Sequence, residues 1–158
     1  MTRSFLRAAA LAFAFSALLP LAAAGDARPA AQPAKARLIP LEIRTAHGVR
    51  RFEVEVARTP AEQERGLMFR TSLPSRGGML FPMGAPREAT FWMKNTVLPL
   101  DMIFIRADGT IARIAERTVP YSLDLVDSGE PVAAVLEIIG GGAAQAGIRA
   151  GDRVIWQR

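Results

Sequence analysis

Two short segments near residue 40 alternate apolar and polar side chains. Residues 41–44 read Leu-Glu-Ile-Arg, and residues 52–56 repeat the alternation more cleanly as Phe-Glu-Val-Glu-Val. A two-residue period is typical of a β-strand with one buried face. His47 and Gly48 lie between the segments and are typical of a turn, so the pattern predicts a β-hairpin.

The next pattern predicts a short helix. Thr59 can cap a helix whose first residue is Pro60, and Glu62 stands three positions after the cap. This arrangement is a capping box, in which threonine and glutamate each bind a backbone amide of the first turn. We expect a helix from Pro60 to about Leu67, with Gly66 near its end.

Short apolar segments separated by turns continue to the end of the chain. They predict strands at residues 79–81 (stopped by Pro82), 89–93, 100–105, 111–116, 132–139 and 153–156. Residues 100–105 are apolar on both faces except for Asp101, which predicts a central strand. A second short helix is expected between the Gly140-Gly141-Gly142 run and Gly147.

These elements together predict one domain over residues 38–158. We expect a mostly β (α+β) fold, with two short helices and a compact, antiparallel-rich sheet that is barrel-like or strongly curved.

The first 24 residues have the pattern of a Sec-type signal peptide. Arg3 and Arg7 precede the apolar run 8–19, and Ala22-Ala23-Ala24 forms a cleavage site before Gly25. The alternative is an uncleaved anchor, but the run is shorter than the ~20 residues that span a bilayer. Residues 25–37, rich in Ala and Pro, are expected to form a flexible linker. The mature protein is therefore expected in the periplasm or medium, without a stable membrane span.

Charge and composition exclude several classes of partner. Removing Arg3 and Arg7 lowers the formal net charge from +5 to +3. No basic stripe alternates with aromatics, so a nucleic-acid partner is not expected. Cysteine is absent, so the domain must be stable without disulfides. The sequence leaves the oligomeric state open.

The residues with the most chemical potential lie between Phe91 and Asp101. In a functional interpretation, Trp92 floors a pocket, and Lys94, Asn95 and Thr96 at its lip hold a small polar or anionic ligand or a peptide. In a structural interpretation, Lys94 and Asp101 form a partly buried ion pair that ties two strands, because a carboxylate in an apolar strand requires a partner.

Three further residues are candidates for ligand binding. Arg65 and Arg70 flank an apolar run and have the planar fork that recognises carboxylates, although both are also typical of a solvated surface. Glu137 interrupts an apolar strand and could face water, pair with one of these arginines or act as a general acid. With one histidine, His47, no cysteine and irregularly spaced methionines, we expect no metal and no cofactor.

Five motifs follow one another along the chain in an order that resembles a known family. They are Gly66-Leu67-Met68-Phe69-Arg70, Gly78-Met79-Leu80-Phe81, the run from Phe91 to Asp101, Val135-Leu136-Glu137 and Gly147-Ile148-Arg149-Ala150-Gly151-Asp152. Together they resemble the domain-of-unknown-function 192 family of small prokaryotic proteins over roughly residues 43–156. Met83 departs from the pattern where an aromatic is common, and Gly140-Gly141-Gly142 replaces a plainer turn. The resemblance implies a compact β-rich fold with short helices and supplies no activity.

We therefore expect an exported envelope protein that acts as a non-catalytic small-ligand or peptide binding module near Trp92. One alternative is a hydrolase-type enzyme with Lys94 and Asp101 as its acid–base pair. The other is a structural accessory protein without a ligand.

Overall fold

The structure, a computed structural model, describes residues 38–157. The signal peptide expected at residues 1–24 and the linker expected at 25–37 lie outside the described residues. Within residues 38–157, no helix has the length and apolar character needed to cross a membrane.

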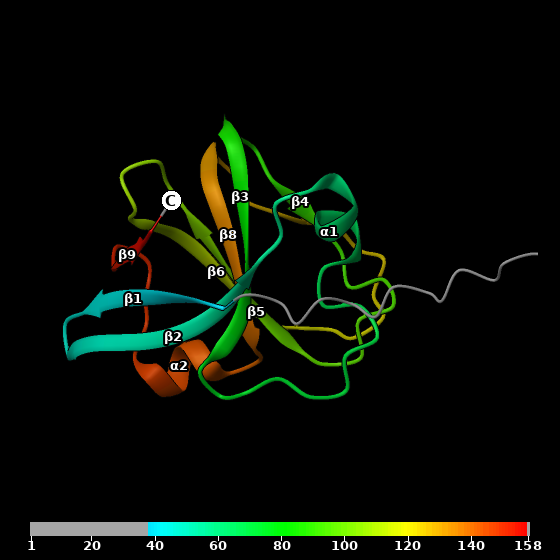
Figure 1. Cartoon of the computed structure of the whole chain (residues 1–158), viewed down its shortest axis with the longest axis horizontal. Helices are drawn as coiled ribbons and strands as arrows, with labels where there is room; N and C mark the ends of the chain where they lie inside the picture. Colours follow the sequence, from blue (N-terminus) through cyan, green and yellow to red (C-terminus); the bar gives the residue numbers. More distant parts are fainter. Residues whose placement is uncertain (1–37, 158) are drawn as a thin grey trace, which may run out of the picture. The chain divides into compact units, whose positions relative to one another are not determined.

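Nine strands and two helices follow one another along the described chain (Figure 1). They are β1 (Ile39–Thr45), β2 (Gly48–Val56), α1 (Pro60–Arg65), β3 (Gly77–Arg87), β4 (Thr90–Phe91), β5 (Leu100–Ile105), β6 (Ile111–Thr118), β7 (Val126–Asp127), β8 (Val132–Ile139), α2 (Gly142–Ala146) and β9 (Arg153–Trp156).

Seven of the strands form one sheet in the order β6-β5-β8-β3-β2-β1-β9, and β4 pairs with β7 separately. Neighbouring strands are antiparallel except β2 and β3, whose connection contains α1. β3 and β8 lie side by side in Figure 1, with the β1–β2 hairpin on one side and α1 on the other. The expected mostly β fold with two short helices is confirmed, as is the interior position of β5, whose six residues are all buried.

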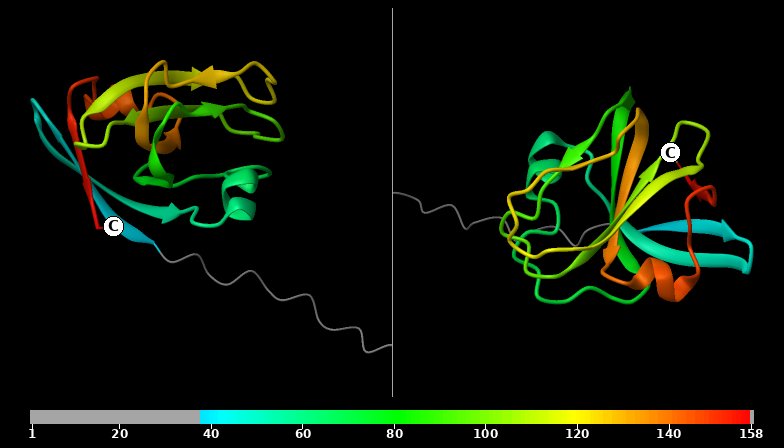
Figure 2. Two further views of the ribbon diagram at one scale, coloured as in Figure 1. Left: turned by 90° about the horizontal axis from the view of Figure 1, so that it is seen from above. Right: turned by 180° about the vertical axis from the view of Figure 1, so that it is seen from behind.

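Alternate residues of the inner strands pack into two separate hydrophobic clusters. One contains Leu80, Ile103 and Leu136 and also takes in residues of β1, β2, β9 and α2. The other contains Phe81, Phe104 and Val135 and is completed by residues around α1 and β4. Both faces of β8 are therefore covered, and the separation of α1 from α2 is visible in both views of Figure 2.

The strand order has two ends, β6 and β9. Thr110, which immediately precedes β6, forms a single isolated bridge with Arg153 of β9. The backbone amide of Ile111 donates to the carbonyl of Asp152 at 2.8 Å, and Val154 donates to Gly109 at 2.8 Å. One bridge is not the continuous ladder of a closed barrel.

The prediction that Pro82 stops its strand is wrong, because β3 continues to Arg87. Pro82 pairs with Ala134 of β8, while the pairing of β3 with β2 ends at Leu80. The carbonyl of Pro82 accepts a hydrogen bond from the side chain of Gln63 at 3.1 Å, so the backbone polar groups of Pro82 point away from β8. A proline is tolerated there because the missing N–H faces an edge without a neighbouring strand.

The capping box of α1 is confirmed. The backbone amide of Glu62 donates to the Thr59 hydroxyl at 3.2 Å, and the Thr59 amide donates to the Glu62 carboxylate at 2.8 Å. The Thr59 amide, followed by that of Arg58, lowers the pKa of Glu62 below its usual value. The helix ends at Arg65, slightly earlier than expected, and Gly66 is its C-cap with a φ of 46°.

We predict that Thr59→Ala lowers the free energy of unfolding by ~1 kcal/mol, because an amide of the first turn loses its acceptor. Urea melts of the variant measure the change. Thr59→Ser is the matched control, since it keeps the hydroxyl. Equal midpoints for the wild type and Thr59→Ala would contradict the prediction.

Candidate functional site

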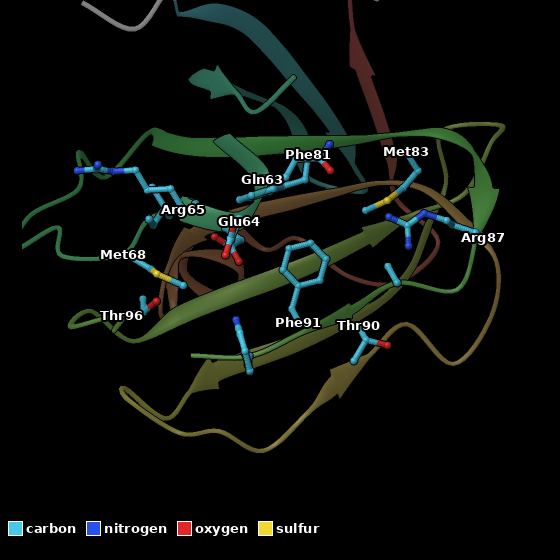
Figure 3. A pocket seen from close by; sticks show the side chains of 15 residues that line it. Gln63, Glu64, Arg65, Met68, Phe81, Met83, Arg87, Thr90, Phe91 and Thr96 are labelled. Carbon is cyan, nitrogen blue, oxygen red and sulfur yellow. The ribbon is translucent and has the colours of Figure 1, made fainter. Parts of the chain in front are cut away.

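A cavity of about 260 Å³ opens between α1, β3, β4 and the middle of β8. Figure 3 shows Arg65 and Met68 on one side of this cavity, Met83 and Arg87 on the other, and the ring of Phe91 between them. The cavity is lined by Gln63, Glu64, Arg65, Gly66, Leu67, Met68, Phe81, Met83, Arg87, Ala89, Thr90, Phe91, Trp92, Thr96 and Glu137.

The register of the sheet places Glu137 at the base of this cavity. Glu137 lies opposite Met79 of β3 and Met102 of β5, in the centre of three adjacent strands. Gly78 helps to bring β3 this close, because a Cβ at this position would collide with the backbone carbonyl oxygen of Glu137. Side chains alternate along a strand, so Glu137 faces the same side as Val135, toward α1 and β4.

The Glu137 carboxyl has no partner among the described residues and keeps contact with solvent through the cavity. The residue is 4 % exposed, and its carboxyl oxygens make no hydrogen bond or ion pair with any residue in 38–157. Burial alone raises the pKa of Glu137 to about 8. A carboxyl group with so high a pKa is predominantly neutral at pH 7 and is typical of a functional site when it also faces a cavity.

Aromatic and thioether side chains form the apolar part of the cavity wall. Phe81 and Phe91 meet edge to face, with ring centroids 5.3 Å apart and an interplanar angle of 82°. Met68 and Met83 add flexible apolar surface, which adapts to the shape of a ligand. Apolar side chains of this kind, combined with placed polar groups, are typical of a small-molecule site.

Of the other polar side chains that line the cavity, Gln63 and Thr96 are the two that are not exposed, and both donate elsewhere. The Gln63 amide nitrogen donates to the carbonyls of Ala57 at 3.2 Å and Pro82 at 3.1 Å. The Thr96 hydroxyl donates to the carbonyl of Lys94 at 3.2 Å. Gln63 and Thr96 therefore offer the cavity oxygen acceptors.

The segment from Trp92 to Thr96 is a turn held by neighbouring loops. The strand expected over residues 89–93 is confined to β4, because the Met93 amide instead donates to the carbonyl of Ser122 at 3.0 Å. Asn95 has a left-handed φ of 55°, and its carbonyl accepts from the amide of Phe69 at 2.9 Å. Asparagine tolerates this conformation better than most residues.

The turn places Trp92 and Lys94 at the surface. Trp92 is 44 % exposed and lines the cavity. Lys94 is exposed, and its Nζ lies 5.0 Å from the centroid of the Trp92 ring. Lysine is thus held by a cation–π contact, outside the set of residues that line the cavity.

The expected pairing of Lys94 with Asp101 is not formed. Asp101 is fully buried, and its carboxylate accepts hydrogen bonds from the backbone amides of Arg117 at 2.8 Å and of Gly141 and Ala143 at 2.9 Å each. These bonds tie β5 to the start of α2 and to β6. Three amide donors satisfy the carboxylate, so it requires no cation. Lys94 and Asp101 are therefore not assembled as an acid–base pair.

The two candidate arginines have different environments. Arg70 forms a bidentate ion pair with Glu55, at 2.6 Å for both contacts, and does not line the cavity. Arg65 lines the cavity at its mouth but extends away from Phe91 (Figure 3). Neither arginine forms an ion pair with Glu137 within the described chain.

Of the sequence candidates, the cavity brings together Arg65, Trp92, Thr96 and Glu137. It leaves out Arg70, Lys94, Asn95 and Asp101. Sequence reasoning missed Gln63, Phe81, Met83, Arg87 and Phe91 as lining residues. The signal available in the sequence was Glu137, a polar residue in a strand that is otherwise apolar on both faces. The residues that pack against the same face of this strand line the cavity. In residues 38–157, no group of three or more His, Cys, Asp or Glu side chains could hold a metal ion.

We predict that Asp101→Asn lowers the free energy of unfolding by ~2–3 kcal/mol, because an amide group then opposes a buried backbone donor. Lys94→Ala should change it by less than ~0.5 kcal/mol, as exposed substitutions do. Urea melts of both variants and the double mutant measure any coupling. Additive effects are expected, and a large coupling between the two positions would contradict this account of Asp101.

We predict that Glu137→Gln stabilises the protein increasingly as pH rises. The folded chain keeps the Glu137 proton up to about pH 8, whereas the unfolded chain releases it near 4.5. The contribution of the protonated Glu137 carboxyl to the free energy of unfolding is fully present below pH 4.5. It is lost as pH rises through 8, which lowers the free energy of unfolding by up to roughly 5 kcal/mol. Urea melts at pH 5, 7 and 9 measure the difference from wild type. Exposed Glu53→Gln is the control, and parallel pH profiles for Glu137→Gln and wild type would contradict the prediction.

Comparison with known proteins gives a family. Among curated proteins, nothing matches. A crystal structure described as "a putative transcription regulator" from Sinorhizobium meliloti 1021 is 43% identical, with a TM-score of 0.74, and the match covers 77% of this chain and 95% of that chain. A protein of unknown function from Novosphingobium aromaticivorans DSM 12444 is 45% identical, with a TM-score of 0.76 and coverage of 83% and 94%. A family model, DUF192 (uncharacterized ACR), matches residues 42–156, and the chain belongs to this family.

Proposed function

We propose that this protein is a non-catalytic binding module that holds a small ligand in the cavity above Glu137. The observation that carries the proposal is the Glu137 carboxyl group, which belongs to a residue that is only 4 % exposed, has no partner among the described residues and faces a cavity. A polar group that loses its contact with water without gaining a partner costs ~1–3 kcal/mol. A ligand that fills the cavity must therefore supply a hydrogen-bond or ionic partner for the Glu137 carboxyl.

The remaining lining supports a ligand of limited size. The volume of about 260 Å³ is slightly below the ~300–1,000 Å³ of sites for drug-sized molecules. It fits a group about as large as one long side chain. The occupant of the cavity is thus either a small molecule or one side chain of a peptide whose backbone stays outside the cavity.

We further propose that the protein acts in the cell envelope, after export by the signal peptide that residues 1–24 predict. A barrel-like closure of the sheet would provide a rigid support for the cavity. The bridge between Thr110 and Arg153, at the two ends of the strand order, supports that closure.

An enzyme is the second candidate, favoured by the Glu137 pKa of about 8. A carboxyl with a pKa near the working pH is suited to general acid–base catalysis. Glu137 thereby replaces Lys94 and Asp101 as the residue for a hydrolase-type reaction. A structural accessory role, in contrast, requires no occupant in the cavity.

We predict that native mass spectrometry of the protein, recovered from the periplasm of a Gram-negative host, shows mature chain starting at Gly25 with an added ligand mass. Met83→Trp should lose this mass, because the larger side chain fills the cavity. Met83→Leu is the matched control and should retain it. A mass that is unchanged by Met83→Trp would contradict the site, and absence of an added mass in all three proteins would favour the structural role. A bound species that changes chemically over time, in wild type but not in Glu137→Gln, would favour the enzyme.

A further inference from the structure

We propose that the ligand group held above Glu137 is a primary ammonium, with the Glu137 carboxylate as its counter-ion. The ammonium belongs either to a free small amine or to a lysine side chain. This inference rests on the proposed ligand-binding function and names the chemistry of its ligand.

The half-buried Gln63 and the buried Thr96 leave mainly acceptors for a ligand. The Gln63 amide nitrogen and the Thr96 hydroxyl already donate their protons to backbone carbonyls. The atoms left to bind a ligand at these positions are oxygen acceptors, and Glu137 adds a carboxyl without a donor. A ligand that matches this lining must bring several N–H donors, and a primary ammonium has three.

Aromatic side chains form part of the cavity wall. Phe81, Phe91 and Trp92 line the cavity together with Glu137. The negative faces of aromatic rings attract a cation, and the attraction strengthens when the site excludes water. The Trp92 ring already holds the Lys94 ammonium, 5.0 Å from its centroid, so Phe81 and Phe91 are the rings available to a ligand cation.

The other charged groups stand at the mouth of the cavity. They are Glu64 and Arg65 from the α1 end and Arg87 from β3, and all three are exposed. The Arg87 guanidinium also donates to the carbonyl of Glu88 at 3.4 Å. Water and salt screen charges at the mouth more than a charge at the base. An anionic group placed deep in the cavity would meet the acceptors of Gln63, Thr96 and Glu137.

Binding of an ammonium couples to a proton on Glu137. Burial raises the pKa of Glu137 to about 8, so this carboxyl is predominantly protonated at pH 6–7. The balanced event is that R–NH₃⁺ and the Glu137 carboxylic acid form an ammonium–carboxylate pair and release one proton to water. The affinity should therefore rise about tenfold per pH unit below pH 8 and level off above it. A ligand that accepts a hydrogen bond from neutral Glu137 has the opposite dependence, and its affinity falls above pH 8.

The test is calorimetric titration of the full mature chain with butylamine at pH 6, 7 and 8, in two buffers of different ionisation enthalpy. We expect affinity to rise about tenfold from pH 6 to 7, with close to one proton released per amine. Glu137→Gln should weaken binding at least about tenfold at pH 8, because the counter-ion is lost. The exposed Glu53→Gln variant is the control and should bind as wild type.

Three further probes complete the test. If Nα-acetyl-lysine amide, whose side-chain ammonium is intact, binds as well as butylamine, the site is assigned to lysine side chains. If it does not bind, the site is assigned to free amines. Binding of butyramide or butyrate but not butylamine, with affinity that falls above pH 8, overturns the ammonium while leaving ligand binding intact. Failure of every probe overturns the ammonium as well. If native mass spectrometry then also shows no bound mass, the proposed function fails with it.

Discussion

β8 is covered on both of its faces, and this constraint decides where a charged group on it can go. Val135 and Leu136 point into different hydrophobic clusters, so no position in the middle of this strand faces bulk water. Glu137 nevertheless lies in the middle of β8. Its carboxyl group is accommodated by a cavity on the side of α1 and β4 and by a raised pKa that keeps it neutral. The cavity, its aromatic wall and the proposed ligand chemistry all depend on that burial.

The two buried carboxyl groups of the sheet are handled by opposite physical means. Asp101 accepts three backbone amides and connects β5 with α2 and β6. Glu137 has no such donors among the described residues, and desolvation dominates its pKa. A fully hydrogen-bonded carboxylate stabilises a fold, whereas one without a partner is retained at a cost and is typical of a site. This contrast separates structure from candidate function more sharply than burial does.

The loops around the cavity show a second sign of constraint. The four residues other than glycine with positive φ in the described chain are Phe69, Asn95, Arg117 and Tyr121. Phe69 and Asn95 are joined by a backbone hydrogen bond, and the Tyr121 amide donates to the carbonyl of Thr96 at 3.2 Å. Left-handed conformations in such residues cost free energy and tend to gather near functional regions. Here Phe69, Asn95 and Tyr121 fix the turn that carries Trp92 and Thr96 to the cavity, whereas the amide of Arg117 donates to Asp101.

The sequence by itself determined the local elements, because short-range patterns control them. The alternation at residues 52–56, the capping box at Thr59 and the apolar run of β5 each predict their element, and the family resemblance extends over the same chain. The partners of Lys94, Asp101 and Glu137 were decided only by tertiary structure. A sequence shows that a buried carboxylate requires donors, but Asp101 obtains them from amides 16 to 42 residues away. Likewise, the cavity joins α1, β3, β4 and β8, whose proximity follows from strand order and register.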